Sequence, residues 1–495
     1  MLFNSVGFLI FFPIVLLGYY ALPQKLRKYW LLAASYYFYM CWNAKYFVLI
    51  LFATIITYFG SIAISKINEG SFENEKKTRY KKLVTAAVIT VALGVLFLFK
   101  YFNFFFAMLS KIFSIFGANV NIGLNLLLPV GISFYTFQSI SYIIDVYRGD
   151  IKAERRFVNY ALFVSFFPQL VAGPIERSAN LLPQLDNLKG FSYDDFTNGL
   201  KIMVYGFFQK LVLADRIAVL VNTVYNNSAE YKGAPVLVAT VLFAVQIYCD
   251  FAGYSNIALG AARCMGIGLM RNFNMPYFSL SIKDFWRNWH ISLSTWFKDY
   301  LFIPLGGSRK GFWRTNINLM IIFAVSGLWH GAAFHFVAWG LLHGAYQVVG
   351  NITKPYRDKG YQMLHISQTF LPVRIFKAVC TFVLVDFAWI FFRANSFGEI
   401  GNIIKSIFAP SGYNATAWDL SSLGLNERDI GIIIIGIAVL FICSLLQHCG
   451  FGMAYINKLA LPIRWALYIG GLFLVLAYGY YGPLAAPSQF VYFQF

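Results

Sequence analysis

Three histidines stand within the apolar stretch "SGLWHGAAFHFVAWGLLHG", residues 326–344, at His330, His335 and His343. The whole chain of 495 residues has only six histidines. An imidazole titrates near neutrality, so it can take a proton from an attacking hydroxyl group and return it to a leaving group. Ionisable side chains at membrane depth are costly, which makes these three residues candidates for chemistry.

A metal site and a purely structural role are the alternatives for these histidines. Around a helix His330 and His335 stand about 140° apart and His335 and His343 about 80° apart. The i, i+4 spacing of a zinc helix and a nearby carboxylate are both missing, which argues against a metal site. Each imidazole could instead bond a backbone carbonyl in a packed bundle, and this stays open for His335 and His343. It is weaker for His330, because Gly327 and Gly331 would let a backbone or a substrate approach closely.

A second candidate segment lies upstream, "DFWRNWHISLSTWFKDYLFIPLGGSRKG", residues 284–311, and contains His290. Its charged residues alternate with Trp286, Trp289 and Trp296. This pattern predicts an amphipathic helix at the cytoplasmic interface, with tryptophans at headgroup level. The basic residues could hold the phosphates of an anionic donor, and a surface helix without chemistry is the alternative.

The elements that position these residues belong to a membrane protein. Hydrophobic residues make up 59% of the chain and charged residues 12%, and the mean hydropathy is +0.61. Such values lie outside the range of soluble domains. The net charge of +19 sits in short connections between apolar runs, which the positive-inside bias explains better than nucleic-acid binding. The six cysteines form no CxxC pair and are read as packing residues.

The basic clusters predict a topology if each is cytoplasmic: residues 24–28, 76–82, 148–156 and 271–314. Both ends of the chain are then extracytoplasmic, and the first apolar run is a retained span and not a signal peptide. A separate interfacial helix is expected at residues 102–116. The spans expected are residues 2–22, 30–46, 47–65, 83–99, 126–146, 199–224, 234–262, 316–349 as one broken span or two, 375–392, 430–446 and 463–481.

The stretch "FVSFFPQLVAGPIERS", residues 163–178, starts like a span, but Pro168, Gly173 and Pro174 would break its helix. Irregular backbone at membrane depth is tolerated where protein or a water-filled cavity satisfies it, so a re-entrant segment beside a cavity is expected. A transporter or flippase would share this feature. It would normally need an internal repeat or a membrane-depth carboxylate, and the chain shows no repeat and offers only Asp250 and Asp386.

Five segments together resemble one family. They are "FFPQLVAGPIERS" (166–178), "QIYCDFAGYSNIALG" (246–260), residues 271–309, "GLWHGAAFHFVAWGLLHG" (327–344) and "AWIFFRA" (388–394). In this order they are similar to the membrane-bound O-acyltransferases (MBOAT), in the branch of AlgI-like bacterial polysaccharide O-acetyltransferases. The resemblance implies an all-α polytopic protein, a ring of roughly 10–12 tilted helices with re-entrant segments around a thinned core and a tunnel.

The resemblance also implies site residues. The histidine of the family's "WHG" motif is catalytic and falls on His330, and the histidine of "WHISLS" falls on His290. Acetyl-CoA is the implied donor substrate, with no tightly bound cofactor and no metal. A neutral buried imidazole could serve as general base, or carry the acetyl group itself. The same motifs supply candidates for donor binding or tunnel lining: Trp329, Arg287, Asp284, Asn288, Ser292, Arg309, Gln169 and Pro174.

The chain is expected to form a transmembrane domain, residues 1–485, and an extracytoplasmic aromatic tail, residues 486–495, "APSQFVYFQF". An interfacial anchor would explain four aromatics in the last six residues. The tail also resembles a C-terminal signature of trans-membrane acylation systems, which implies that Tyr492 carries the acyl group to a partner of SGNH serine-hydrolase fold.

The expected function is therefore O-acetylation of an extracytoplasmic polysaccharide from a bacterial cytoplasmic membrane. D-alanyl transfer to teichoic acid is the alternative within the same family, and lipid or protein acylation stands behind it. The residues do not select the polysaccharide, although a composition rich in Lys, Ile and Asn favours a wall or capsule polymer.

Overall fold

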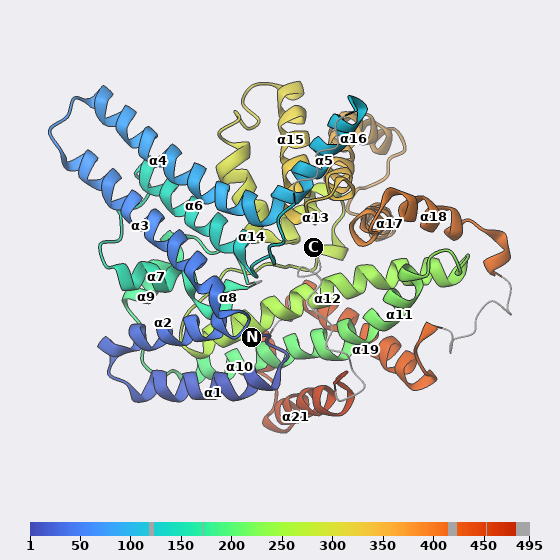
Figure 1. Ribbon diagram of the computed structural model, residues 1–495. Helices are drawn as coiled ribbons and strands as arrows, with labels where there is room; N and C mark the ends of the chain where they lie inside the picture. Colours follow the sequence, from blue (N-terminus) through green and yellow to red (C-terminus); the bar gives the residue numbers. More distant parts are fainter. Residues whose placement is uncertain (118–122, 172, 414–422, 452, 482–495) are drawn as a thin grey trace. The chain divides into compact units, whose positions relative to one another are not determined.

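The computed structural model describes residues 1–117, 123–171, 173–413, 423–451 and 453–481. All regular structure in these ranges is helical (Figure 1). Helices satisfy their own backbone hydrogen bonds, which the interior of a bilayer requires. The predicted all-α, multi-pass membrane fold is confirmed. Six described helical segments are long and apolar enough to cross a membrane: Ala44–Glu69, Asn74–Ile115, Ala234–Cys264, Leu371–Arg393, Glu427–His448 and Leu461–Tyr478.

The chain divides into two compact units. Unit 1 comprises Met1–Met203 and Ile257–Met270, and unit 2 comprises Val204–Asn256 and Arg271–Phe495. Two helices, α10 (Tyr193–Phe207) and α12 (Ala234–Cys264), contribute residues to both. The predicted boundary at residue 485 lies outside the described residues.

Unit 1 is built on a helical hairpin, α3 and α4, against which α6 packs. The α3–α4 hairpin is the long blue pair in Figure 1. The helices of this unit besides α10 and the end of α12 are α1 (Val6–Ala21), α2 (Gln24–Met40), η1 (Ala44–Tyr46), α3 (Phe47–Glu69), α4 (Asn74–Leu96), η2 (Phe97–Tyr101), α5 (Phe102–Ile115), α6 (Ile132–Arg148), α7 (Phe157–Ser165), α8 (Phe167–Leu170) and α9 (Ser178–Asp186).

The expected span at residues 30–46 is instead α2, Gln24–Met40, which includes the basic cluster at residues 24–28 and is followed after a break by the short turn η1. Two further predicted elements of unit 1 differ from the structure. The expected interfacial helix at residues 102–116 is not separate, because the π-helical turn η2 carries α4 directly into α5. The expected span at residues 126–146 becomes helical only at Ile132. Gly131 before it has a φ of +76°, and a Cβ there would lie 2.6 Å from the Leu170 carbonyl oxygen. The left-handed glycine sets the start of α6.

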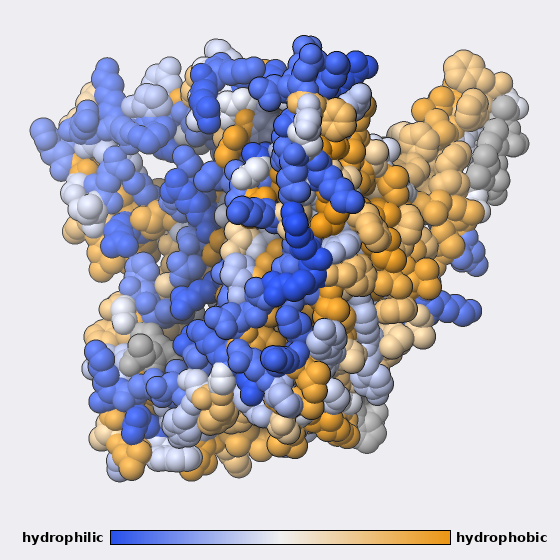
Figure 2. Space-filling view, turned by 90° about the vertical axis from the view of Figure 1, so that its left-hand side faces the viewer, coloured by the Kyte–Doolittle hydropathy of each residue, from blue (hydrophilic) through white to orange (hydrophobic). Residues whose placement is uncertain are grey.

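Two ion pairs of unit 1, Arg155 with Glu69 and Arg156 with Asp186, each involve the last residue of a helix. Figure 2 shows hydrophilic side chains on the side of the molecule that carries the α3–α4 turn. Near the start of α7, Arg156 forms an ion pair with Asp186 at the end of α9. The hydrogen bond from the Arg156 guanidinium holds the pKa of the Asp186 carboxyl below its usual range. These exposed groups tie helix ends together outside the apolar segments.

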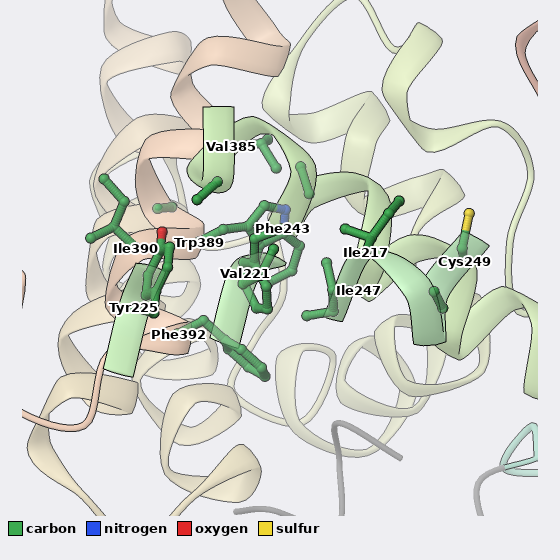
Figure 3. Close-up of a cluster of buried hydrophobic side chains, with 14 of the residues drawn as sticks. Ile217, Val221, Tyr225, Phe243, Ile247, Cys249, Val385, Trp389, Ile390 and Phe392 are labelled. Atoms are coloured by element: carbon green, nitrogen blue, oxygen red, sulfur yellow. The ribbon is translucent and has the colours of Figure 1, made fainter. Parts of the chain in front are cut away.

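Unit 2 holds a large cluster of buried apolar side chains, and both histidines of interest belong to this unit. Side chains from α11, α12 and α17 meet in this cluster, among them Val221, Phe243 and Trp389 (Figure 3). The remaining elements are η3 (Phe208–Ala214), α11 (Asp215–Asn226), η4 (Pro276–Phe278), α13 (Ile282–Asn288), α14 (Ile291–Phe297), η5 (Lys298–Phe302), α15 (Phe312–His330), α16 (Phe334–Met363), α17 (Leu371–Arg393), α18 (Phe397–Ile407), η6 (Pro410–Tyr413), α19 (Glu427–His448), α20 (Met453–Ile456) and α21 (Leu461–Tyr478).

Candidate active site

The stretch at residues 326–344 forms two helices that cross at glycines. The helix α15 ends at His330, and α16 starts at Phe334. A Cβ at Gly327 would overlap the Phe336 carbonyl oxygen, and one at Gly340 would overlap the Phe323 carbonyl oxygen. The two helices therefore pack backbone to backbone at these positions, as small residues allow in membranes. This close packing fixes the end of α15, where His330 stands.

The His330 imidazole lies in an aromatic box. Its side chain is 4% exposed. Its ring centroid is 4.9 Å from that of Trp329, 5.0 Å from Trp339 and 5.4 Å from Phe392, all in edge-to-face arrangements. Aromatic walls of this kind exclude water from a buried reacting group.

His290 lies at a break between two short helices. The helix α13 ends at Asn288, and α14 begins at Ile291. Between them His290 has φ +43° and ψ +55°, a left-handed conformation that residues with a Cβ rarely adopt. The prediction of one amphipathic helix through residues 284–311 is therefore wrong.

The tryptophans of this segment were also expected to face the lipid headgroups, but the structure buries them inside the protein. Trp286, Trp289 and Trp296 are all buried. Trp289 packs against Trp389 at 5.1 Å and Phe273 at 5.0 Å between ring centroids. The turn at His290 directs the segment into the core of unit 2, where burial of a large aromatic ring is strongly favourable.

The structure brings the two predicted catalytic histidines together around one indole ring. The Trp329 ring centroid is 6.1 Å from that of His290 and 4.9 Å from that of His330. The His290 ring also meets Phe251 of α12 edge to face at 4.7 Å. Both imidazoles and Trp329 are buried. Two histidines from separate segments of the sequence thus share one apolar site.

The other two histidines of the stretch have different surroundings. His335 forms a hydrogen bond through Nδ1 with the Phe391 carbonyl oxygen at 3.0 Å, which is a packing role. His343 is fully buried, and its Nδ1 accepts a hydrogen bond from the Trp286 indole N–H at 3.3 Å. Because Nδ1 is the acceptor, the proton of a neutral His343 ring is on Nε2. His343 also lies beside Trp339, a wall of the His330 box.

Most polar candidates for donor binding near His290 are either hydrogen-bonded within and beside α13 or exposed. Asp284 accepts hydrogen bonds from Ser281 and Arg287 in the first turn of α13. Asn288 donates to the Asp284 carbonyl oxygen and to the Ser279 hydroxyl group. Arg287 is exposed, and so is Arg309, which lies in the turn between η5 and α15. Only Ser292 and Trp329 of this set are buried beside the histidines.

Gln169 and Pro174 belong to unit 1. The helix predicted to break at residues 163–178 does break: α7 ends at Ser165, and α8 and α9 follow as separate short helices. Gln169 is buried and donates through Nε2 to the Phe163 carbonyl oxygen at 2.6 Å, across this break. Pro174 is buried as well. The Gln169 side chain therefore stabilises the irregular segment itself.

Sequence reasoning named Asp250 and Ser292 but missed the two groups of buried polar residues in unit 2 to which they belong. Lys210 forms ion pairs with Asp215 at 2.8 Å and with Asp250 at 2.6 Å, and all three side chains are nearly fully buried. Asn272 binds both Ser255 and Ser292 through its side-chain amide. The motif segments 246–260 and 271–309 contain most of these residues, but nothing in their spacing shows which partners meet. Within the described residues no cluster of three His, Cys, Asp or Glu side chains could hold a metal ion.

Comparison with known proteins identifies the family of this chain, and the matching region includes both histidines of the site. The model of the membrane-bound O-acyltransferase family matches residues 35–390, which include α13–α16 and both histidines. The chain is 38% identical over 424 residues to the protein named probable alginate O-acetylase AlgI from Pseudomonas putida, covering 86% of this chain and 82% of the relative.

Two relatives carry other names. The peptidoglycan O-acetyltransferase of Helicobacter pylori is 32% identical over 444 residues, with 83% of this chain and 80% of the relative covered. The teichoic acid D-alanyltransferase of Bacillus subtilis is 29% identical over 298 residues, with 55% and 70% covered. The chain belongs to the membrane-bound O-acyltransferase family and is a multi-pass membrane O-acyltransferase.

Proposed function

We propose that this protein transfers an acetyl group from cytoplasmic acetyl-CoA towards an extracytoplasmic polysaccharide of a bacterial cell envelope, with His330 as general base and His290 beside it. The observation that carries the proposal is the pair of buried histidines around Trp329. The relatives named alginate O-acetylase and peptidoglycan O-acetyltransferase support acetyl as the acyl group and a glycan as the acceptor.

The chemistry needs one mobile proton. An acceptor hydroxyl oxygen attacks the thioester carbonyl carbon, so that a C–O bond forms and the C–S bond breaks. His330 takes the proton from the hydroxyl group and returns it to the thiolate of CoA, which leaves as a thiol. General acid–base catalysis of this kind typically contributes about 10² to 10⁴ in rate. The aromatic box lowers competition from water, which would hydrolyse the thioester.

Both substrates have to reach an imidazole that is almost covered. His330 is 4% exposed, so the side chains around it must move aside when donor and acceptor bind. A tunnel open to both membrane faces is part of the proposal, because the donor is cytoplasmic and the acceptor is outside.

We further propose that Tyr492 carries the acetyl group between these sides, as a tyrosyl ester that a partner of SGNH serine-hydrolase fold then takes up. Tyr492 lies outside the described residues, so the argument is chemical. A phenolate is a better leaving group than an alkoxide. The acetate ester of the Tyr492 phenol would therefore remain activated for a second acetyl transfer.

The first experiment measures release of free CoA from acetyl-CoA by the purified protein. We expect His330→Ala to lower the rate at least about 100-fold, the lower range expected for loss of a general base, while the protein stays folded. His335→Ala is the matched control, because His335 already has a backbone partner. A transporter would release no CoA, and equal rates in His330→Ala and the wild type would refute the assignment of the base.

The second experiment separates the carrier from the base. Tyr492→Phe keeps the aromatic tail but removes the hydroxyl group, so polysaccharide acetylation in cells should vanish while membrane insertion persists. Acetylation at the wild-type level in Tyr492→Phe would eliminate the carrier role of Tyr492. It would not affect the proposal that His330 is the general base. If a D-alanyl donor is consumed in place of acetyl-CoA, the function is the one named for the Bacillus subtilis relative.

A further inference from the structure

The left-handed conformation of His290 is held from both sides by hydrogen bonds of one neighbouring segment, residues 272–274. The Ile291 N–H donates to the Asn272 carbonyl oxygen at 2.9 Å, and the Asn274 N–H donates to the Asn288 carbonyl oxygen at 3.0 Å. These two bonds lie immediately after and shortly before His290. A rare backbone conformation persists only where the surroundings over-determine it, and these bonds do so here.

The side chain of Asn272 adds a second set of bonds to the same turn. Its Oδ1 accepts hydrogen bonds from the Ser292 hydroxyl group at 2.6 Å and from the Ser292 N–H at 3.3 Å. The first N–H groups of a helix have no partner inside the helix, and His290 gives α14 no side-chain cap. Asn272, 2% exposed, therefore caps α14 in place of His290.

The other end of the same amide reaches α12. Asn272 Nδ2 donates to the Ser255 hydroxyl oxygen at 3.3 Å. Phe251, one helical turn before Ser255, presents its ring to the His290 imidazole at 4.7 Å. Residues four apart lie on the same helix face, so α12 touches the imidazole with one side chain and the Asn272 amide with the next. An amide can accept at one end and donate at the other, which neither a carboxylate nor an alkyl side chain can do.

We propose that Asn272 is a positioning residue: it holds the turn at His290 in its left-handed conformation and thereby directs the imidazole towards Trp329 and His330. This inference rests on the proposed function for its catalytic consequence, but not for its structural one. Asn272 does not touch the reacting atoms. Its effect on acyl transfer passes through His290.

The structural part is tested by the reactivity of His290 towards diethyl pyrocarbonate, read by mass spectrometry of the full-length protein in detergent. Asn272→Leu keeps the approximate size and removes all three side-chain bonds. We expect modification of His290 to be at least tenfold faster in this variant. The control is Asn159→Leu, which removes the bonds of another fully buried asparagine, in unit 1. Unchanged His290 reactivity in Asn272→Leu, or an equal rise in both variants, would overturn the proposal.

The catalytic part is tested by the rate of CoA release. We expect Asn272→Leu to lower kcat at least tenfold and to leave KM for acetyl-CoA within twofold. In a His290→Ala background the same substitution should cause no further loss, because the residue on which it acts is absent. A further tenfold loss there would show that Asn272 acts independently of His290 and would refute the proposal. If His290→Ala and His330→Ala both keep the wild-type rate, the proposed function fails, while the reactivity experiment still decides the role of Asn272.

Discussion

The three histidines at residues 326–344 cannot be told apart by their sequence context, but the structure gives each of them different neighbours. His330 ends a helix inside an aromatic box and shares Trp329 with His290. His335 is bonded to the backbone of α17, and His343 accepts a bond from Trp286. A hydrogen-bonded imidazole in a packed core has a sufficient structural reason to be there. His290, which lies outside this stretch, has a left-handed backbone conformation, and Met275 and His365 are the other described non-glycine residues with positive φ.

A structural role for His335 predicts a stability effect without a catalytic one. His335→Ala should lower the free energy of unfolding by about 1–3 kcal/mol, since the Phe391 carbonyl oxygen loses its buried partner. His335→Asn keeps an N–H donor near Nδ1 and should lose less. Thermal unfolding in detergent measures both, and CoA release per folded molecule should stay within twofold. If His335→Asn abolishes CoA release at unchanged stability, His335 has a chemical role.

At the scale of elements, the close crossing of α15 and α16 sets the position of His330. Two glycines, Gly327 on α15 and Gly340 on α16, allow carbonyl oxygens of the opposite helix to approach their Cα atoms. On the other side of the site, α13 and α14 are too short to be stable alone. They depend on their contacts with η4, η5, α16, α17 and the 272–274 segment. The site is thus assembled from helix ends and from breaks between helices.

Adding one methyl group at the crossing should force these helices apart. Gly340→Ala places a Cβ against the Phe323 carbonyl oxygen, which cannot move without its helix. We expect a loss of about 1–3 kcal/mol in unfolding free energy, as for other overpacked cores, and a fall in CoA release. Gly350→Ala on the same helix is the matched control, because nothing lies within 4 Å of its Cβ. It should be neutral or slightly stabilising, since alanine favours helix. Equal stability of the two variants would contradict the role given to the crossing.

At the scale of the whole molecule, charge and apolar length suggest how the chain sits in the membrane. The ends of α3 and α4 beside their connecting turn carry six basic residues against Glu69, Glu73 and Glu75; the basic residues are Lys66, Lys76, Lys77, Arg79, Lys81 and Lys82. Both helices beside it belong to the described segments able to cross a membrane. The positive-inside bias predicts that this turn is cytoplasmic, and the short turn η1 before α3 would then be extracytoplasmic.

Labelling with a membrane-impermeant maleimide checks this topology. In a variant lacking the exposed cysteines Cys41, Cys380, Cys443 and Cys449, Lys45→Cys in η1 should be labelled in intact cells. Glu75→Cys, in the first turn of α4, should be labelled only after the membrane is permeabilised. The reverse labelling pattern would invert the proposed orientation. Cytoplasmic acetyl-CoA would then have to enter from the opposite face of the protein.

From the sequence alone, composition determined that the protein lies in a membrane and is helical, and the prolines determined the break after α7. Short motifs were sufficient to make His290 and His330 candidates. Each of these signals is local in the sequence. The sequence could not determine the turn at His290 or the burial of Trp286, Trp289 and Trp296. An alternation of charged and aromatic residues fits a surface helix as well as a broken, buried one. The backbone bonds from residues 272–274 and the contact with Phe251 decide between the two, and these partners meet only when distant segments pack together.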